Sequence, residues 1–227
     1  KGNTFSWGGV YNTFSEDPET KFTKLNVFEH FAPEIPKSYS NGSILFLANI
    51  DPSLQNKVID LYPKPRIVGM DTMNFWINSK KRELDKILKR VDILTINELE
   101  LRLIGKKDSL EGCLKVLRKK YKIRFLIIKR GSAGSMLFSN QTIKWIPSYP
   151  FCDVVDPTGA GDSYAGALFS YLDNVKTVTQ KHILESMVYA SALSSFTIEK
   201  FGVERLLTVR KSELNSRIKF LKNLSKL

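Results

Sequence analysis

This chain of 227 residues contains the run Asp156-Pro157-Thr158-Gly159-Ala160-Gly161-Asp162-Ser163. An apolar run ending at Val154-Val155 precedes it, and a helical pattern of apolar residues over 165–172 follows it. The order predicts a strand, a glycine turn and a helix. Small residues at 159–161 let backbone N–H groups approach a ligand closely, and the N–H groups at a helix start favour an anion. The run therefore predicts a phosphate cradle.

Asp162 lies in the same turn and can only accept hydrogen bonds when it is ionised. It can take a proton from a hydroxyl group that attacks a phosphoryl group, while the amides of Gly159, Ala160 and Gly161 hold that phosphoryl group. This arrangement predicts phosphoryl transfer to an alcohol. Taken alone, the turn has an alternative interpretation, because its aspartate can simply support the helix start electrostatically.

Apolar runs alternate with amphipathic segments from residue 43 onward. The runs are 44–47, 67–70, 93–96 and 125–128. This alternation predicts an α/β fold with a largely parallel sheet. Polar residues follow the runs at Asn49, Asp71, Asn97 and Lys129. These positions are the expected carboxyl ends of parallel strands, where open α/β sheets bind their ligands.

Helices and one hairpin complete the expected elements. The helices are expected near 53–61, 79–89, 98–104, 110–120, 161–172 and 179–198. Loose alternation around Ser139-Asn140-Gln141 predicts a hairpin over 135–146. The basic stretch 210–226 carries apolar residues at helical spacing, which indicates a surface helix with a solvated basic face.

The composition limits the classes of protein that the chain can belong to. Its net charge of +12 is spread thinly, which favours anionic small substrates over nucleic acid or a membrane surface. No apolar run approaches the roughly 18 residues of a membrane span, and the start lacks a signal peptide's apolar core, so a cytoplasmic location is expected. Cys113 and Cys152 are far apart and are expected to be ordinary buried thiols.

The glycine turn closely resembles the signature of the ribokinase-like (PfkB-type) carbohydrate kinases, in which the last aspartate is the catalytic base. Three further runs occur in the family's order: Asn97-Glu98-Leu99-Glu100, Lys129-Arg130-Gly131-Ser132-Ala133-Gly134 and Ser195-Phe196-Thr197-Ile198-Glu199-Lys200-Phe201-Gly202. The resemblance implies a three-layer α/β/α fold and an ATP-dependent kinase that phosphorylates a hydroxyl group of a sugar or sugar-like metabolite. A nucleoside kinase that uses the same base is the alternative.

Residues 1–40 are interpreted as a partial β lid together with a linker, and the linker is expected at 32–38. The family places such a lid over its sugar pocket. Strands are expected at 4–7 and 22–28, and residues 41–227 are expected to form the nucleotide-binding and catalytic domain. Lid edges in this family often pair between subunits, which implies a homodimer. The family's first quarter has no counterpart, so the chain is expected to be N-terminally incomplete.

The resemblance also assigns metal ligands. Asn97 and Glu100 match an Asn-x-x-Glu element near the phosphates and Mg²⁺, an ion that prefers oxygen ligands. Asn97 can equally cap a helix, and both roles can coexist. Asp156 and Thr158 match positions that help to coordinate K⁺, for which the alternative is a turn-stabilising aspartate and a capping threonine.

The nucleotide is expected to bind between two further segments. Gly131 and Gly134 would let the chain turn closely around phosphates or ribose, and Lys129 would offset phosphate charge. The segment from Ser191 to Gly202 resembles an adenine-side wall, in which Thr197, Lys200 and Gly202 fall at matching positions. The alternatives are an ordinary two-glycine turn and a helix end followed by a glycine loop.

Other classes of protein fit the sequence less well. The chain has no Gly-x-x-x-x-Gly-Lys-Ser/Thr run, and the third glycine of a dinucleotide-binding turn would fall at Tyr164. A hydrolase nucleophile elbow at Ser163 would need glycine where Ala165 stands, and His182 lies in a helical pattern. A kinase-like protein that binds nucleotide without turnover stays open, and so does the identity of the sugar or nucleoside.

Overall fold

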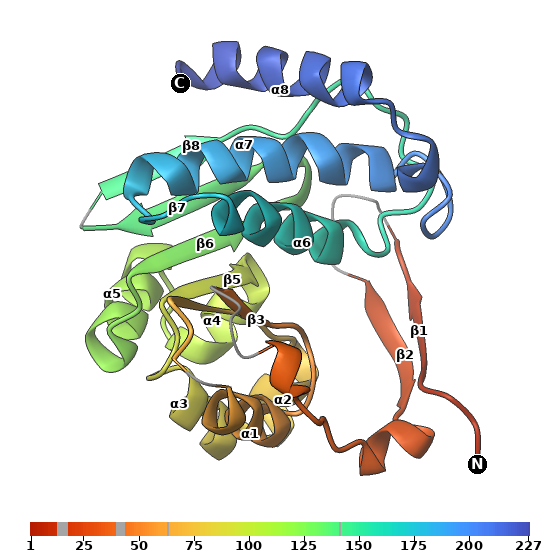
Figure 1. The fold of residues 1–227 in the computed structure, drawn as a ribbon, viewed down its shortest axis with the longest axis vertical. Coiled ribbons are helices and arrows are strands. Elements are labelled where there is room, and N and C mark those ends of the chain that lie inside the picture. The colour runs from red at the N-terminus through yellow and green to blue at the C-terminus, as the bar shows by residue number, and fades with distance from the viewer. Residues whose placement is uncertain (13–17, 40–43, 63, 141) are drawn as a thin grey trace.

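Six strands form the larger of two sheets in the computed structural model, which describes residues 1–12, 18–39, 44–62, 64–140 and 142–227 (Figure 1). The strands are β3 (Ile44–Leu47), β4 (Ile67–Asp71), β5 (Ile93–Asn97), β6 (Phe125–Lys129), β7 (Ser135–Ser139) and β8 (Thr142–Ile146), in that spatial order. Strands β3 to β6 pair in parallel, whereas β7 and β8 add antiparallel pairs. The predicted largely parallel sheet and the predicted hairpin are therefore confirmed, although Gln141 lies outside the described residues.

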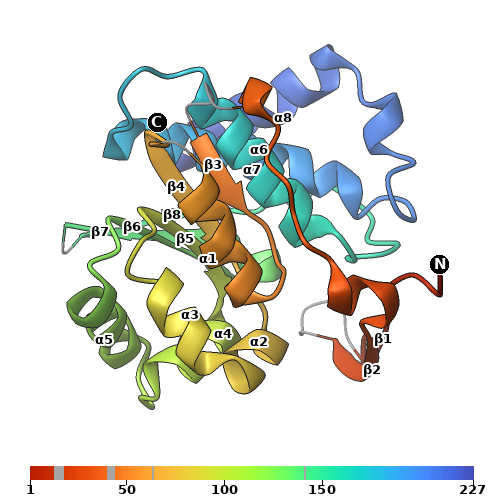
Figure 2. The same ribbon diagram turned by 60° about the horizontal axis from the view of Figure 1, so that its bottom comes forward.

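Helices cover both faces of this sheet, which explains why its central strands are apolar throughout. The helices are α1 (Pro52–Leu61), α2 (Asn74–Ser79), α3 (Lys81–Ile87), α4 (Glu98–Gly105), α5 (Leu110–Tyr121), α6 (Ala160–Asp173), α7 (Gln180–Thr197) and α8 (Lys211–Ser225). Helices α1 to α5 lie on one face and α6 to α8 on the other, so the predicted three layers are confirmed (Figure 2). Neighbouring residues of one strand enter opposite cores, as Leu126 and Ile127 do.

The helix predicted over 79–89 differs from the structure. A first helix begins at Asn74 and buries Trp76 and Ile77, and a second helix follows at Lys81. Lys80 separates them with φ −127° and ψ 36°, which is not helical. The sequence prediction was wrong at this start because the apolar pair of α2 is too short to show a helical period.

A smaller antiparallel sheet pairs β1 (Ser6–Val10) with β2 (Glu19–Lys24). The strand predicted over 22–28 is wrong beyond Lys24, because Asn26 has a φ of 53° and residues 26–30 form a 3₁₀ helix. The sheet stands beside the edge of the large sheet where the parallel strands end (Figure 1). The expected boundary at residues 40 and 41 lies outside the described residues.

Within the described ranges, no helix is both long and apolar enough to cross a bilayer.

Candidate active site

The glycine turn starts helix α6, whereas the strand predicted just before the turn is wrong, because residues 147–158 form no strand. Gly159 has a φ of 82°, a backbone conformation that favours glycine, and it is the residue before the helix begins. The N–H group of Ala160 donates to the Pro157 carbonyl at 3.1 Å, so this amide of the predicted cradle closes the turn. Among the described residues, the N–H groups of Gly159, Gly161 and Asp162 have no hydrogen-bond partner. The Gly159 amide before the helix and two amides at its start can therefore receive an anion.

Lys129 lies directly against this turn. A Cβ atom added to Gly161 would lie 3.4 Å from the Lys129 Nζ atom. The same Nζ atom forms an ion pair of 2.9 Å with Asp71, whose side chain is only 8% exposed. Asp71 ends β4 and Lys129 ends β6, on either side of β5, so the long lysine side chain reaches across the end of the central strand. The parallel sheet thus brings a cation to the cradle.

Burial and charge act in opposite directions on Lys129. Burial alone would lower the pKa of its ammonium group, because it disfavours the charged form. The negative charges of Asp71 and Glu100, together with the Asp71 hydrogen bond and the more weakly felt Asp162, outweigh burial and raise the pKa above its usual 10.5. Lys129 is therefore a permanent positive charge at the turn.

Asp162 has a carboxyl group with raised basicity. Removal of water by the surrounding protein is the main cause that raises its pKa above the usual 3.8, and the nearby Asp71 charge adds to it. Lys129 acts in the opposite direction. The side chain is still exposed at the surface, where an acceptor molecule can reach it. A raised pKa makes a carboxylate a better general base.

Asn97 and Glu100 form a reciprocal cap at the start of α4. The Glu100 N–H group donates to Asn97 Oδ1 at 2.7 Å, and the Asn97 N–H group donates to Glu100 Oε2 at 2.8 Å. The capping interpretation is therefore confirmed, and the predicted role near Mg²⁺ stays a prediction. Glu100 is buried, and its charge is felt by Lys129, so its carboxylate lies near the cradle.

The described residues supply few metal ligands of their own. No group of three or more histidine, cysteine, aspartate and glutamate side chains among them is placed to hold a metal ion. Mg²⁺ is usually held by one or two carboxylates together with substrate phosphates and water, so the predicted Mg²⁺ site stays a prediction. Asp71, Glu100 and Asp162 all lie close enough to Lys129 to affect its charge, and they provide such carboxylates.

The chain leading into the turn is held by other contacts. The Thr158 N–H group donates to Asp156 Oδ1 at 2.9 Å, as expected for a turn-stabilising aspartate. The N–H groups of Val155 and Asp156 donate to the Ile198 carbonyl at 2.8 and 3.2 Å, which ties the turn to the end of α7. The K⁺ site predicted at Asp156 and Thr158 stays a prediction.

A cavity of about 460 Å³ opens from the turn. Its lining comprises Lys129, Gly131, Ser132, Gly134, Ser148, Tyr149, Pro150, Cys152, Val154, Pro157, Ala160, Gly161, Tyr164, Ser191, Ser194, Ser195 and Ile198. The structure thus brings six residues predicted from the sequence to one cavity: Lys129, Gly131, Gly134, Ala160, Gly161 and Ser191. Its size and its mixture of apolar and hydroxyl groups suit a nucleotide.

Three residues expected in the adenine-side wall lie elsewhere. Thr197 is buried at the last turn of α7, and its methyl group lies 3.9 Å from the position of a Cβ atom on Gly159. Lys200 and Gly202 follow the helix and are exposed. Ile198, the residue after the helix, lines the cavity, whereas these three residues do not. Their roles stay predictions.

Sequence reasoning missed several lining residues. Cys152 was expected to be an ordinary buried thiol, but it is only partly buried and lines the cavity, whereas Cys113 is fully buried as expected. Ser194 and Ser195 belong to the segment that was expected to form the adenine-side wall, and they line the cavity together with Ser191. These serines stand at i, i+3 and i+4 and therefore share one face of α7.

Comparison with known proteins gives a family match over most of the chain. The family model described as pfkB family carbohydrate kinase matches residues 39–209. A ribokinase from Lactococcus lactis is 33% identical over 144 residues, which cover 63% of this chain and 43% of that protein. A cytidine kinase from Thermococcus kodakarensis is 25% identical over 140 residues, which cover 60% of this chain and 50% of that protein. The chain thus spans half or less of these relatives' lengths.

Solved structures share the fold. The nucleoside kinase of Methanocaldococcus jannaschii, described as an archaeal member of the ribokinase family, has a TM-score of 0.69 at 20% identity, over 90% of this chain and 64% of that chain. A putative ribokinase II from E. coli in complex with ATP and Mg²⁺ has a TM-score of 0.69 at 17% identity, over 95% of this chain and 71% of that chain. At these identities the likeness establishes the ribokinase-like fold.

Proposed function

The chain belongs to the pfkB family of carbohydrate kinases, and from this premise we propose that it transfers the γ-phosphoryl group of ATP to a hydroxyl group of a sugar or sugar-like metabolite. One observation supports the proposal most directly. The exposed Asp162 carboxylate stands beside the two unpartnered amides at the start of α6, with the Lys129 ammonium group against the same turn. A base, an anion site and a positive charge thus meet at one point.

The phosphoryl group is held at the turn in this proposal. The Gly161 and Asp162 amides and the α6 dipole stabilise its oxygens, and Lys129 offsets their negative charge. When bound, Mg²⁺ would neutralise further charge, with Glu100 as the predicted protein ligand, and K⁺ would be held by Asp156 and Thr158. The Gly159 conformation keeps these amides directed at one place before any ligand arrives.

Asp162 acts on the acceptor. Its carboxylate takes the proton of the attacking hydroxyl group as a new oxygen–phosphorus bond forms and the bond to the ADP oxygen breaks. The carboxylate becomes a carboxylic acid, and the proton later passes to solvent, to which the side chain is exposed. Phosphoryl transfer has a loose transition state, so positioning and charge would supply most of the rate.

The base and ribose of the nucleotide would occupy the cavity. Tyr149 and Cys152 supply one side of its lining, and the serines of α7 supply hydroxyl groups on another. The Tyr164 side chain, which also lines the cavity, has its hydroxyl oxygen 2.8 Å from that of Ser135, and this contact joins α6 to β7.

The β1–β2 sheet would act as the lid. The Tyr11 hydroxyl, just after β1, lies 3.3 Å from the Thr158 hydroxyl, so the small sheet already touches the turn. A lid at this place would exclude water from the transfer. Phe5, Val10 and Phe22 of this region are each more than 40% exposed, which supports a homodimer that pairs two lids.

A nucleoside acceptor is the second candidate. The nucleoside kinase of Methanocaldococcus jannaschii matches 25% of positions over 194 residues, which cover 85% of this chain and 60% of that protein. That match extends over more of this chain than the ribokinase match does. The cavity that would hold ATP is the same in both cases, and only the acceptor differs.

Release of ADP tests the proposed function. Purified protein is incubated with Mg·ATP and, separately, ribose, fructose, adenosine and cytidine, and ADP is measured by a coupled assay. Acceptor-dependent ADP from a sugar supports the first proposal, and ADP from a nucleoside alone supports the second. If Mg·ATP binds but no acceptor releases ADP, the protein binds nucleotide without turnover.

A further inference from the structure

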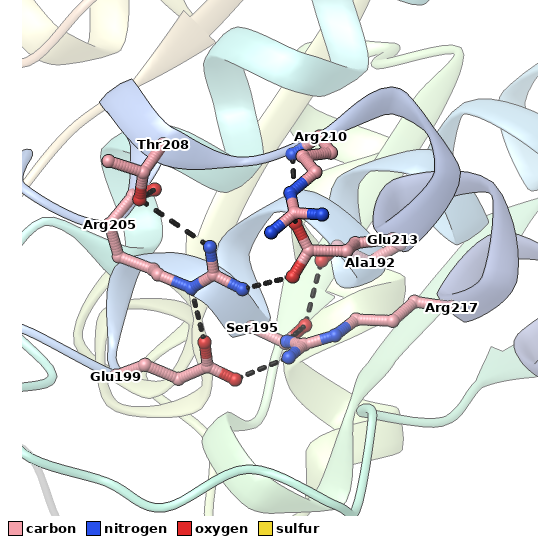
Figure 3. A network of polar contacts seen from close by, with 8 residues as sticks. All are labelled: Ala192, Ser195, Glu199, Arg205, Thr208, Arg210, Glu213 and Arg217. Atoms are coloured by element: carbon pink, nitrogen blue, oxygen red, sulfur yellow. Dashed lines mark hydrogen bonds and ion pairs between the residues drawn. The ribbon is translucent and has the colours of Figure 1, made fainter.

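Arg217 lies on α8, beyond residue 209, where the family match ends. Its side chain is only 11% exposed although α8 is a surface helix. Figure 3 shows this side chain extending from α8 toward Ser195 and Glu199 at the end of α7. A buried guanidinium group needs partners for its donors, and the identity of those partners indicates what it does.

The guanidinium group is held by both polar and aromatic contacts. It donates to Ser195 Oγ at 2.7 Å and forms an ion pair with Glu199. Its carbon atom lies 3.6 Å from the ring centroid of Phe196 and 4.4 Å from that of Tyr149. Arginine suits this place because its planar fork donates at the edge while its faces stack on aromatic rings.

Two further residues tie this arginine to the rest of α8. Arg205 donates to Glu199 at 2.9 Å and to Glu213 at 2.6 Å, and Glu213 accepts from the backbone N–H group of Arg210, the residue before α8 (Figure 3). We call Glu199, Arg205, Glu213 and Arg217 the α7–α8 network. It contains two positive and two negative charges, so it is balanced, and it connects α8 to the end of α7.

Two of the residues that Arg217 contacts line the cavity, while Arg217 itself does not. Ser195 Oγ donates to the Ala192 carbonyl at 2.7 Å and accepts from Arg217, so both contacts fix its orientation. Tyr149 belongs to the segment between β8 and the glycine turn, and its ring lies against the same guanidinium group as the ring of Phe196. One side chain thus sets the spacing between two walls.

We propose that Arg217 is a positioning residue for the nucleotide: it holds Ser195 and Tyr149 where they contact the base and ribose. This inference rests on the proposed function, because it assumes that the cavity binds ATP. Arg217 should matter for the nucleoside part of the ligand and not for the phosphates, which the amides of α6 receive. The two contributions can therefore be separated with a ligand that has phosphates alone.

Isothermal titration with Mg·ATP and with Mg·tripolyphosphate makes this separation. For Arg217→Ala we expect about tenfold weaker binding of Mg·ATP. The variant loses the hydrogen bond from the charged Arg217 to Ser195, and about tenfold is the lower end of the effect expected for such a bond. Tripolyphosphate binding should be unchanged. In turnover assays, KM for ATP should rise by a similar factor while kcat changes less than about twofold, as for loss of uniform binding.

Two further variants and one control sharpen the test. Arg217→Lys keeps a positive charge near Glu199 but lacks the planar fork, so its affinity for Mg·ATP should lie between those of wild type and Arg217→Ala. Ser195→Ala removes only the hydroxyl group that Arg217 orients and should weaken Mg·ATP binding by a few-fold. Lys219→Ala removes an exposed cation from the same helix and should leave the affinity for both ligands unchanged.

The outcomes are distinct. If wild type binds Mg·ATP and a folded Arg217→Ala binds it equally well, this inference is overturned while the proposed function stands. If Arg217→Ala weakens the binding of Mg·ATP and of Mg·tripolyphosphate equally, Arg217 serves general stability, and the inference is again overturned. If it fails to fold, equal affinity of Ser195→Ala and wild type for Mg·ATP overturns it. If wild type binds no Mg·ATP, the proposed function fails, and this inference fails with it.

Discussion

The glycine turn at 156–163 forms one part of the cavity, and the α7–α8 network supports another part through Ser195 and Tyr149. The turn uses the backbone: a glycine at positive φ and two amides at a helix start. The network uses ion-paired side chains from α8 and from the segment between α7 and α8, and its Arg217 stacks on Phe196 of α7. The anion site at the turn is formed by backbone groups of eight consecutive residues. The network is formed by side chains, and it exists only after distant segments have packed.

The largest effect is expected at the turn. Asp162→Asn should lower kcat by about 1,000-fold with the acceptor found in the ADP assay, because a general base typically contributes 10²- to 10⁴-fold. The affinity for Mg·ATP should be retained, since the amides of α6 are unchanged. Asp108→Asn, an exposed aspartate between α4 and α5, is the matched control. Near-normal turnover by Asp162→Asn would contradict the assignment of the base.

The Lys129–Asp71 pair connects the turn to the sheet, and Lys129→Met breaks it. Because this leaves a carboxylate buried without its partner, we expect a loss of about 3 kcal/mol in the free energy of unfolding, measured with urea. Lys120→Met breaks an ion pair of the same 2.9 Å length at a more exposed place and should cost less than about 1 kcal/mol.

A double variant separates the two roles of Lys129. Lys129→Met with Asp71→Asn removes both charges and should recover much of the lost stability. It should not recover activity, because the positive charge at the turn is still absent. Full recovery of kcat in the double variant would show that Lys129 serves the fold alone.

The pH dependence of kcat/KM tests the charges around Asp162. The base must be ionised to work, so activity should fall as the pH drops through the pKa of Asp162, which lies above the ordinary 3.8. Asp71 raises that pKa by its negative charge. Asp71→Asn should therefore move the acid limb to lower pH. If the acid limb of the kcat/KM profile of Asp71→Asn stays in place or moves to higher pH, this electrostatic account is contradicted.

The smallest expected effect concerns the cavity wall. Cys152 lines the cavity and Cys113 is fully buried, so a thiol reagent added to the native protein should label Cys152. Saturating Mg·ATP should slow this labelling at least about fivefold, whereas tripolyphosphate should slow it less. Cys152→Ser should abolish the signal. Labelling that is insensitive to Mg·ATP would indicate that the nucleotide binds elsewhere.

Local patterns account for most of what the sequence predicted. Apolar runs followed by polar residues identified the parallel strands and placed Asp71, Asn97 and Lys129 at one edge of the sheet. The glycine turn and the start of α6 followed from residue types in eight positions. Such features depend on backbone conformation and on the period of apolar residues, and both are determined by residues that are consecutive in the sequence.

Contacts between distant segments could not be predicted in this way. The pair Asp71 and Lys129 is 58 residues apart, and Arg217 is 22 residues from Ser195. Nothing near Arg217 distinguishes it from the other cations of a basic helix until α8 packs on α7. Cys152 was misjudged for the same reason, since its exposure depends on a cavity built by several elements.

Titration of Mg·ATP into three proteins tests the central claim, that the start of α6 receives the phosphates. Gly161→Val puts a side chain in front of Lys129 at a position without positive φ, and Gly166→Val changes the same helix where a Cβ atom meets nothing within 4 Å. Wild type and Gly166→Val should bind Mg·ATP with equal affinity, and Gly161→Val should bind at least about tenfold more weakly. Equal affinity of all three proteins, or no binding by folded wild type, would contradict the claim.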